Sequence, residues 1–264
     1  MSPEVSVITP TYNAQEFIVE TISSVQNQSF QDWEMVIVDD HSTDGTAQMI
    51  NDAAAGDARI IPVLRKENGG AAEARNAGIR RARGRYIAFL DADDLWLSNK
   101  LERQLAFMRD GDLPFVFSAY HVIDKSGKIV GNVQVPETVN YRQLLLTNVI
   151  GCLTAIYDSK QLGLVEMPNI RKRQDFGLWL NLLKRTPHAF GMQEELSFYR
   201  LHEQSMSSNK WSSAQYNWHL YRKVENMQFP LAAYYFANYA IRGVMRKLSQ
   251  QPSGMKGQAA SDLM

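Results

Sequence analysis

Cysteine, net charge and long apolar segments are all scarce in this 264-residue sequence. Its single cysteine, Cys152, excludes an internal disulfide framework and fits a reducing compartment. Lysine plus arginine and aspartate plus glutamate both number 28, so the formal net charge is zero. This balance argues against a nucleic-acid partner, because a general nucleic-acid binder carries a basic excess. No apolar run reaches the roughly 20 residues of a membrane-spanning helix, and the nearest, residues 231–248, contains Asn238 and three basic side chains.

Several sequence signals are missing as well. The N-terminus has no basic segment followed by an apolar one, so no signal peptide is expected. No Gly-x-Gly-x-x-Gly turn follows the first predicted strand, which argues against a dehydrogenase. Cys152 lies in an apolar run, and because free cysteine is usually buried we expect a packed core thiol rather than a nucleophile. The length suits one large domain, or a domain with an extension.

The sequence does contain three carboxylates directly after an apolar segment. Residues 86–90 are apolar and precede Asp91, Asp93 and Asp94. Like charges this close repel one another, so we expect a cation or another strong partner to hold them. Asp94 or Ser98 could cap the following helix, but a cap needs one such side chain and not three. The cluster therefore predicts a Mg²⁺ or Mn²⁺ site for a phosphorylated ligand.

Strand and helix patterns alternate through the first hundred residues. Apolar segments at 5–8, 34–38, 59–64 and 85–90 predict strands, with helices after 13–16, after 42–45 and over 71–83. This alternation predicts a mostly parallel sheet covered by helices on both faces. Ala74, Ala77 and Gly78 are small enough to let the third helix approach the sheet closely. Asn13 and Glu16 have the spacing of a capping box for the first helix.

Polar side chains follow the carboxyl ends of all four predicted strands, where open α/β sheets bind ligands. We therefore expect one site at this edge, although the side chains of Asp39 and Asp40 could instead bond their own turn and Tyr12 could be a core residue. The acids follow the second and fourth strands, whereas a phosphoacceptor receiver domain carries them after the first. The residues of this edge are Thr9, Pro10, Thr11, Tyr12, Asp39, Asp40, Arg65, Lys66, Glu67, Asn68, Asp91, Ala92, Asp93 and Asp94.

The second half carries different signals. Strands are predicted at 115–118 and within 149–157, with a hairpin turn at 124–128. A helix is predicted to begin near Asp175, whose carboxylate would cap it. Residues 199–202 lead into a polar loop at 203–210, and two helices follow, the last over 229–248. Composition predicts a disordered tail from residue 250 onward.

Four motifs together resemble those of family 2 glycosyltransferases with the GT-A fold. They are VITPTYN at 7–13, IVDDHSTDGT at 37–46, NGGAAEARNAG at 68–78 and DADD at 91–94, in the family's order. The resemblance implies a GT-A catalytic domain over residues 1–205, divided into a nucleotide-sugar-binding half (1–97) and an acceptor-binding half (98–205). A helical extension at 206–249 and a tail at 250–264 would follow.

The same resemblance implies a reaction. Family members transfer a sugar, usually with inversion, from a nucleotide-diphosphate donor. We expect a UDP-sugar as donor, and a hydroxyl of a glycan or of a polyprenyl-diphosphate-linked glycan as acceptor, in surface polysaccharide synthesis. A non-catalytic nucleotide-sugar-binding module is the alternative, because it would keep the donor residues and need no base.

The resemblance also assigns roles to donor-site residues. Asp39 would bind the uracil or ribose, Asp91 would lie near the ribose, and Asp93 would be the direct ligand of Mn²⁺ or Mg²⁺. Tyr12 would stack on the base, with Thr9 and Pro10 beside it and with Asp40, Asn68 and Ala92 in the surrounding motifs. Arg75 and Arg200 are candidates for phosphate binding. His202 would be a further metal or diphosphate ligand, or else a surface histidine.

Two positions depart from the family. His41 stands where glycine is usual, and if that turn requires a positive φ, histidine tolerates it better than a branched residue does. Gln174-Asp175 stands where the family usually has Glu-Asp. The resemblance implies that Asp175 removes the proton of the acceptor hydroxyl. A capping role and the nearby Arg173 would both favour its charged form and weaken it as a base, but a well-placed hydroxyl offsets this.

The predicted C-terminal helix combines aromatic residues with Arg242, Arg246 and Lys247. This composition suits a membrane surface, and the other interpretation is a helix packed on the catalytic domain. Both fit a cytoplasmic enzyme, peripheral at the inner face of the plasma membrane, that meets a lipid-linked acceptor.

Overall fold

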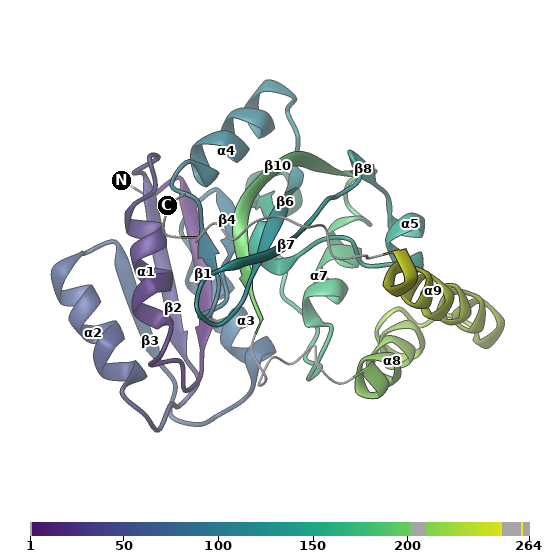
Figure 1. The fold of residues 1–264 in the computed structure, drawn as a ribbon, viewed down its shortest axis with the longest axis horizontal. Coiled ribbons are helices and arrows are strands. Elements are labelled where there is room, and N and C mark those ends of the chain that lie inside the picture. Colours follow the sequence, from purple (N-terminus) through teal and green to yellow (C-terminus); the bar gives the residue numbers. More distant parts are fainter. Residues whose placement is uncertain (1, 202–209, 250–259, 261–264) are drawn as a thin grey trace.

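The computed structural model describes residues 2–201, 210–249 and 260, and the statements below concern these residues (Figure 1). Their strands form one sheet in the order β3-β2-β1-β4-β9-β6-β10-β5, with β7 beside β6 and β8 beside β10. The strands are β1 (Val5–Thr11), β2 (Trp33–Asp39), β3 (Ile60–Leu64), β4 (Tyr86–Phe89), β5 (Leu95–Trp96), β6 (Phe115–Ile123), β7 (Ile129–Val133), β8 (Thr138–Val139), β9 (Ile156–Asp158) and β10 (Ala189–Arg200).

The helices alternate with the strands in the first half, as the sequence predicts. They are α1 (Ile18–Gln26), α2 (Thr46–Gly56), α3 (Ala71–Arg81), α4 (Lys100–Asp110), α5 (Tyr141–Leu146), α6 (Ser159–Leu162), α7 (Gln174–Leu182), α8 (Lys210–His219) and α9 (Phe229–Ser249). A 3-10 turn, η1 (Cys152–Thr154), precedes β9, and a π-helical turn, η2 (Leu220–Val224), follows α8.

Parallel pairing holds for the first four strands of the chain, β3, β2, β1 and β4. Strand β9 then lies antiparallel to both β4 and β6, while β6 and β10 are parallel. The sheet is therefore parallel in the donor half and mixed beyond it. Pro62 lies in β3, which is the edge strand of the parallel half, where a missing N–H is tolerated.

Helices cover both faces of the sheet, as predicted (Figure 1). On one face, buried residues of α1, α2 and α4 pack with Val7, Met35 and Ile37. On the other face, α3, α5 and α7 pack with Ile8, Val38 and Phe89. Because strand residues alternate between faces, the nearly continuous burial along β1, β2 and β4 shows that the sheet is covered on both sides.

Helix α3 approaches the sheet closely through its small residues. A Cβ atom added at Gly78 would lie 2.6 Å from Ile8 Cγ2 and 3.3 Å from Val38 Cγ2. Ala74, one turn earlier, is fully buried against the same face. The predicted role of these residues is therefore confirmed, and the short distance fixes the position of α3 relative to β1.

Two local predictions are wrong. The Asn13–Glu16 capping box is absent, since α1 begins at Ile18 without a side-chain cap. Asn13 instead has φ 49° and accepts a hydrogen bond from Thr43 N at 2.8 Å, which ties two loops together. Of the predicted strand within 149–157, only its end is strand, because a 3-10 turn comes first.

The C-terminal helices α8 and α9 lie on the side of the molecule opposite α2 (Figure 1). Tyr221 Oη in η2 donates to Leu145 O of α5 at 2.7 Å. The Glu225 carboxylate accepts from Lys184 Nζ at 2.9 Å and from Tyr141 Oη. The predicted helix over 229–248 is confirmed by α9. The domain boundary at residue 205 lies outside the described residues and stays a prediction.

One residue of the predicted disordered tail is described. Ala260 is buried against Ile123, Ile129 and Phe198, and its N–H donates to Gly127 O at 2.9 Å. The chain is packed at this position, and the predicted disorder of the tail as a whole stays a prediction. The rest of residues 250–264 lies outside the described part.

Substitution of Gly78 by alanine should destabilise the fold. Because the added methyl would collide with Ile8, we expect the free energy of unfolding in urea to fall by about 1–3 kcal/mol. Gly56→Ala is the matched control, since it also adds a methyl to a helix but meets no atom within 4 Å. It should leave stability unchanged or raise it by up to about 1 kcal/mol. Equal stabilities of the two variants would contradict the close packing of α3.

Candidate active site

The loops that follow β1, β2, β3 and β4 are joined at one edge of the sheet. Asp40 N donates to Thr11 O at 2.8 Å, Arg65 N donates to Asp39 O at 2.9 Å, and Leu90 N donates to Ile8 O at 3.0 Å. These bonds extend the parallel ladder to the last residue of each strand. The loops that carry the polar residues of the four motifs therefore begin next to one another, as expected from the sequence.

Asp39 is buried and bonds its own turn. Its Oδ1 accepts from Thr11 Oγ1 at 3.2 Å and from Ser42 Oγ, while Oδ2 accepts from Ser42 N at 3.0 Å. A carboxylate has about four acceptor positions, so one remains for a ligand. The alternative of a self-bonded turn is thus observed, and a donor-binding role stays a prediction.

Asp40 organises the loop that leads into α3. Its carboxylate accepts from Gly69 N at 3.0 Å and from Gly70 N at 2.7 Å, and it forms an ion pair with Arg65. Asn68 Nδ2 donates to Asp40 O at 3.0 Å. The sequence assigned no role to Arg65, although it directly follows β3 at the same edge. Asp40 and Asn68 therefore hold this loop in place, and direct contact with a nucleotide sugar stays a prediction for both.

The residues predicted to flank a base differ in accessibility. Thr9 is fully buried within β1, and its Oγ1 has no hydrogen-bond partner, so it offers no surface to a base. Pro10 is partly exposed and Tyr12 is 53% exposed, which excludes the core position considered for Tyr12. His41 has φ 67°, so this turn does require a positive φ, which a histidine tolerates better than a branched residue does.

Arg75 is buried and points to the acidic loop, so it is not a solvated helix arginine. Its Nη2 forms an ion pair with Asp91 Oδ1, while its Nε has no partner. Burial lowers the pKa of Arg75, but the charge of Asp91, then Cys152 and Asp175, outweighs burial, and the net pKa is raised. The guanidinium of Arg75 thus interacts electrostatically both with the acidic motif after β4 and with Asp175 on α7.

The loop at 91–94 is held by partners from distant parts of the chain. Thr21 Oγ1 donates to Ala92 O at 2.9 Å and to Asp94 O at 3.0 Å. The Asp94 carboxylate is buried and accepts from Arg200 N at 2.9 Å. Burial, then Asp93 and Asp91, raise the pKa of Asp94 well above its usual range. Neither Asp94 nor Ser98 caps α4, which begins after Asn99 without a side-chain cap.

Arg200 is the last residue of β10. The resemblance had instead placed it in a loop after the catalytic domain. Its guanidinium donates to Asp93 O at 2.9 Å, to Lys125 O at 3.1 Å and to Glu20 Oε2 at 2.7 Å. The side chain is 3% exposed. Acceptors of the protein engage all three nitrogens of the guanidinium. We therefore assign Arg200 a structural role, which is to hold the 91–94 loop, and not a role in phosphate binding.

Asp175 lies in the first turn of α7, two residues after the N-cap position. The N-cap position is Arg173, which has φ 67°, and no side chain caps the helix, so the predicted cap is wrong. Asp175 is partly exposed. Trp179, one turn further, is fully buried with its ring 5.6 Å from Phe89 and 5.4 Å from Phe115. This aromatic contact fixes α7 against β4, the strand that carries the acidic motif.

Cys152 is a residue of this region that the sequence placed in the core. It is partly exposed in η1 and lies within the field of Asp91, Arg75 and Asp175. Desolvation and then the charge of Asp91 raise the pKa of Cys152 well above its usual range. Its apolar neighbours in sequence concealed this position, and no local motif marks it.

A divalent metal fits the donor chemistry of the acidic loop. Asp91 has a side chain 30% exposed, and Asp93 is partly exposed, so both carboxylates face accessible space. Among the described residues, no three Asp, Glu, His or Cys side chains are grouped to hold a metal by themselves. Mg²⁺ is commonly bound by one or two carboxylates together with substrate phosphates, which is the set available here. The predicted ligand His202 lies outside the described residues.

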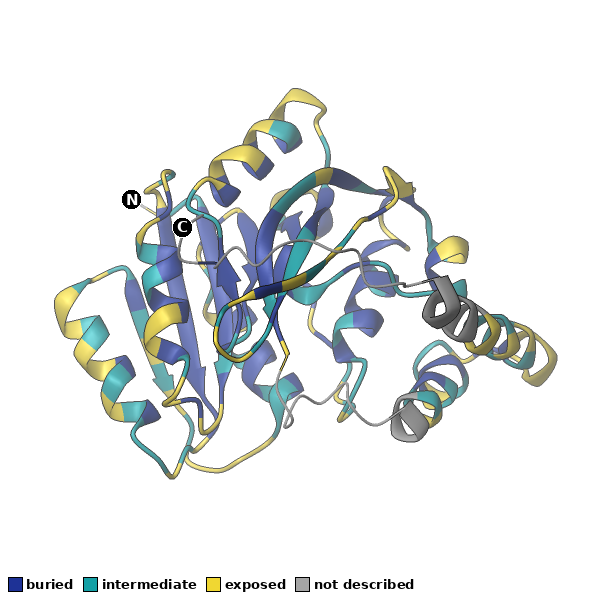
Figure 2. Ribbon diagram, viewed as in Figure 1, coloured by how far each residue is buried: buried dark blue, intermediate teal, exposed yellow. Residues whose placement is uncertain are grey.

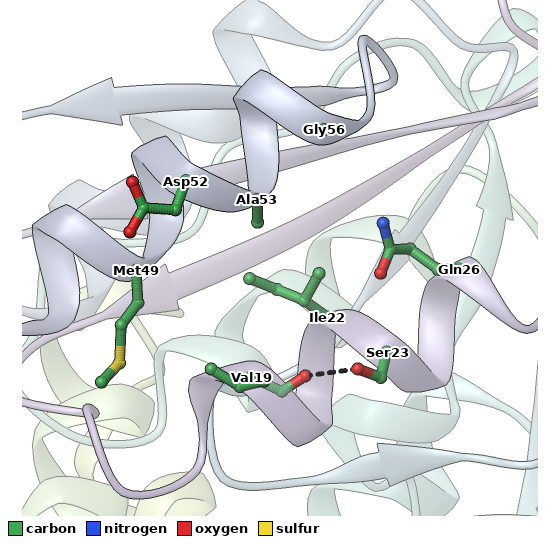
Figure 3. Close-up of a pocket in the computed structure, with 8 residues that line it drawn as sticks. All are labelled: Val19, Ile22, Ser23, Gln26, Met49, Asp52, Ala53 and Gly56. Carbon is green, nitrogen blue, oxygen red and sulfur yellow. Dashed lines mark hydrogen bonds between the residues drawn. The ribbon is translucent and has the colours of Figure 1, made fainter.

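A separate hollow of about 370 Å³ lies between α1 and α2 (Figure 3). None of the predicted site residues lines it, so it is distinct from the sheet-edge site. The lining residues are Val19, Ile22, Ser23, Gln26, Met49, Asp52, Ala53 and Gly56.

Sequence comparisons agree with this architecture. The family model for Glycosyl transferase family 2 matches residues 6–192. The chain is 46% identical over 247 residues to "Putative teichuronic acid biosynthesis glycosyltransferase TuaG" of Bacillus subtilis (strain 168), covering 93% of this chain and 98% of TuaG. It is 37% identical over 255 residues to "UDP-Glc:alpha-D-GlcNAc-diphosphoundecaprenol beta-1,3-glucosyltransferase WfgD" of Escherichia coli, covering 96% and 98%.

Solved structures share the fold at low identity. S. aureus TarS 1–349 in complex with UDP-GlcNAc has a TM-score of 0.70 and 21% identity, covering 90% of this chain and 71% of that chain. The mannosyltransferase PcManGT from Pyrobaculum calidifontis, in complex with GDP-Man and Mn²⁺, has a TM-score of 0.66 and 18% identity, covering 95% and 77%.

The sheet order, the helices on both faces and the acidic loops at one edge define a glycosyltransferase with the GT-A fold. The chain belongs to glycosyl transferase family 2. The predicted family, fold class and enzyme class are therefore confirmed. None of the helices within residues 2–201 and 210–249 combines the length and apolar character that crossing a bilayer requires.

The reactivity of Cys152 tests the electrostatics of the site. Only the thiolate reacts with iodoacetamide, and the raised pKa leaves little thiolate near neutral pH. Alkylation at about pH 7.5 should therefore be much slower than for glutathione, and the rate should still be rising at pH values above the ordinary thiol pKa of 9.0. Protein unfolded in guanidinium chloride should react as fast as glutathione, and Cys152→Ser gives the background. Fast labelling of the folded protein at neutral pH would contradict the assignment.

Proposed function

We propose that this glycosyltransferase moves a sugar, with inversion, from a UDP-sugar to a hydroxyl of a polyprenyl-diphosphate-linked glycan in surface polysaccharide synthesis. The observation that carries the proposal is the buried Arg75, which pairs with Asp91 and lies within the field of Asp175. A donor motif and a carboxylate suited to acceptor activation thus share one site. The names of TuaG and WfgD support the pathway and the acceptor class.

The donor would lie across the carboxyl ends of β1, β2 and β4. Tyr12 and Pro10 offer accessible surface for the base, and the free acceptor position of Asp39 would receive a uracil or ribose hydrogen bond. Asp91, fixed by Arg75, would bind near the ribose. The UDP-GlcNAc complex of TarS, which has the same fold, supports a uridine donor.

Mn²⁺ or Mg²⁺ would be held by Asp93, with Asp91 beside it and with His202 as a further candidate ligand. When bound, the ion neutralises charge on the departing diphosphate. Burial, and then the charges of Asp93 and Asp91, raise the pKa of Asp94, and the closeness of these carboxylates favours a cation at this loop. The Mn²⁺ complex of PcManGT supports the choice of metal.

Asp175 would act as the base. The acceptor oxygen attacks the anomeric carbon as the bond from that carbon to the diphosphate breaks, and the hydroxyl proton passes to the Asp175 carboxylate. A single displacement of this kind inverts the configuration. Catalysis by this carboxylate depends on holding the acceptor hydroxyl close to the anomeric carbon and in line with the bond that breaks.

The location follows from the substrates of the proposed reaction. Nucleotide sugars are cytoplasmic, and a polyprenyl diphosphate lies in the membrane. We therefore place the enzyme in the cytoplasm, working at the inner face of the plasma membrane.

Donor and metal specificity can be measured by thermal unfolding. UDP with Mn²⁺ should raise the melting temperature, because a ligand that binds only the native state stabilises it, whereas GDP with Mn²⁺ should not. EDTA should abolish the shift. Asp93→Asn should lose the metal-dependent part, and Asp52→Asn, an exposed acid on α2, should behave as wild type. A shift with GDP but not with UDP would overturn the donor assignment.

Replacement of the proposed base should separate turnover from donor binding. We expect Asp175→Asn to lower kcat by about 10²- to 10⁴-fold, the usual contribution of general base catalysis, with the UDP-dependent thermal shift retained. The assay is transfer from the UDP-sugar that gives the largest shift to a synthetic lipid-diphosphate acceptor, with Asp52→Asn as the control. If Asp175→Asn transfers sugar at the wild-type rate, Asp175 is not the base. If the wild type transfers nothing although UDP-sugar binds, the chain is a binding module.

A further inference from the structure

Helix α9 presents an apolar face to solvent. Its exposed side chains include Phe229, Leu231, Tyr234 and Ile241, with exposures of 62%, 48%, 57% and 58%. Tyr234 and Ile241 are seven residues apart and therefore share one side of the helix. Residues 229–241 contain no charged side chain at all. Figure 2 shows the largely exposed outer side of this helix. A surface helix normally carries charged residues on its solvent side, so this face is unusual.

The helix is firmly attached through its other side. Ala232 is fully buried, the Tyr235 ring lies 6.4 Å from Tyr221, and the Phe236 ring lies 5.6 Å from Trp218. The exposure of the outer face is therefore not caused by loose packing of α9 on the protein. Among the described residues, the other large exposed apolar side chains are dispersed over different strands, helices and loops, as is normal for a folded protein. On α9, Leu231, Tyr234 and Ile241 lie along one side and form a patch, whereas the Phe229 ring lies 5.6 Å from Trp218.

The C-terminal segment also concentrates positive charge. Residues 210–249 contain six lysines and arginines and a single acid, Glu225, in a chain whose net charge is zero. The side chain of Glu225 is 2% exposed and is paired with Lys184, which lies outside this segment. Three of the basic residues, Arg242, Arg246 and Lys247, follow the apolar face within the same helix.

We propose that α9 binds the surface of an anionic phospholipid bilayer, with its apolar face in the headgroup region. An uncharged apolar face flanked by basic residues is the combination that gives interfacial binding to anionic lipid. A second copy of the chain would explain the apolar face but not the excess of positive charge, since two such surfaces repel each other. The charge therefore decides between these partners. This inference builds on the lipid-linked acceptor of the proposed function.

A direct contact connects α9 to the helix that bears the proposed base. The Arg173 guanidinium lies 5.6 Å from the centre of the Tyr239 ring, within cation–π range. Arg173 is the N-cap residue of α7, two positions before Asp175. A bilayer held by α9 would therefore lie beside the acceptor side of the site, where a lipid-linked hydroxyl must arrive.

Vesicle sedimentation with the purified full chain tests the proposal. Vesicles of phosphatidylcholine with phosphatidylglycerol should bind the protein, vesicles of phosphatidylcholine alone should bind it much less, and high salt should release it. Tyr234→Ser with Ile241→Ser should weaken partitioning by about tenfold or more, because binding scales with buried apolar area. Val130→Ser with Leu164→Ser, both 52% exposed in the wild type, is the matched control and should bind as wild type.

A second pair of variants tests how much the basic residues of α9 contribute to membrane binding. Arg246→Gln with Lys247→Gln should weaken binding to phosphatidylglycerol vesicles on the order of fivefold for each charge removed. Lys128→Gln with Lys160→Gln removes two exposed charges elsewhere and should have no effect. Circular dichroism and thermal unfolding of each variant establish that it is folded.

Three results would overturn the proposal. They are absence of wild-type binding to anionic vesicles, binding that ignores lipid charge and salt, and dimers in light scattering that disappear in the Tyr234→Ser, Ile241→Ser variant. That variant should keep its UDP-dependent thermal shift and its kcat on a water-soluble acceptor. Failure of membrane binding with transfer intact removes only this inference, whereas failure of transfer with membrane binding intact removes the proposed function.

Discussion

The ion pair between Arg75 and Asp91 is the interaction on which the site depends. A buried guanidinium without a carboxylate partner would be costly, so the pair fixes the start of the acidic loop and the orientation of α3 together. The close contact of Gly78 with Ile8 places α3 where Arg75 can reach that loop. Asp175 and Cys152 lie within the field of the same charge. The guanidinium of Arg75 thus links the acidic motif after β4 to helix α7, which carries Asp175.

The other acids of the sheet edge are mainly engaged in building the loops. Asp40 binds two backbone N–H groups and Arg65, and Asp39 binds Thr11 and Ser42. These bonds cost the residues part of their capacity for a ligand, but they hold the remaining lone pairs in fixed positions before a ligand arrives. Preorganisation of this kind is a principal source of electrostatic catalysis.

The sequence predicted the alternating strands and helices of the donor half well, because the apolar pattern of each buried strand and the turn residues after it are local signals. The direction of a strand relative to its neighbours is not encoded locally, so the antiparallel orientation of β9 could not be predicted from the sequence. Asn13 and Asp175 look like helix caps in isolation, yet Asn13 bonds a loop 30 residues away and Arg173 takes the cap position of α7. The partners of Arg200 could not be predicted, since they come from segments far apart in sequence. Cys152 packs against the core as expected, but its nearness to Asp91 and Arg75 has no local signal either.

The anchoring of the 91–94 loop by Arg200 has a consequence for how the chain acquires its structure. The donor for the bond to Asp93 O lies 107 residues further along the chain. All four sequence motifs are complete by residue 94, but the last of them receives its final support only when β10 has paired with β6. Contacts of such long sequence separation form late, because loop closure must precede them. A nascent or truncated chain that ends before β10 therefore contains every motif of the family and lacks a finished acidic loop.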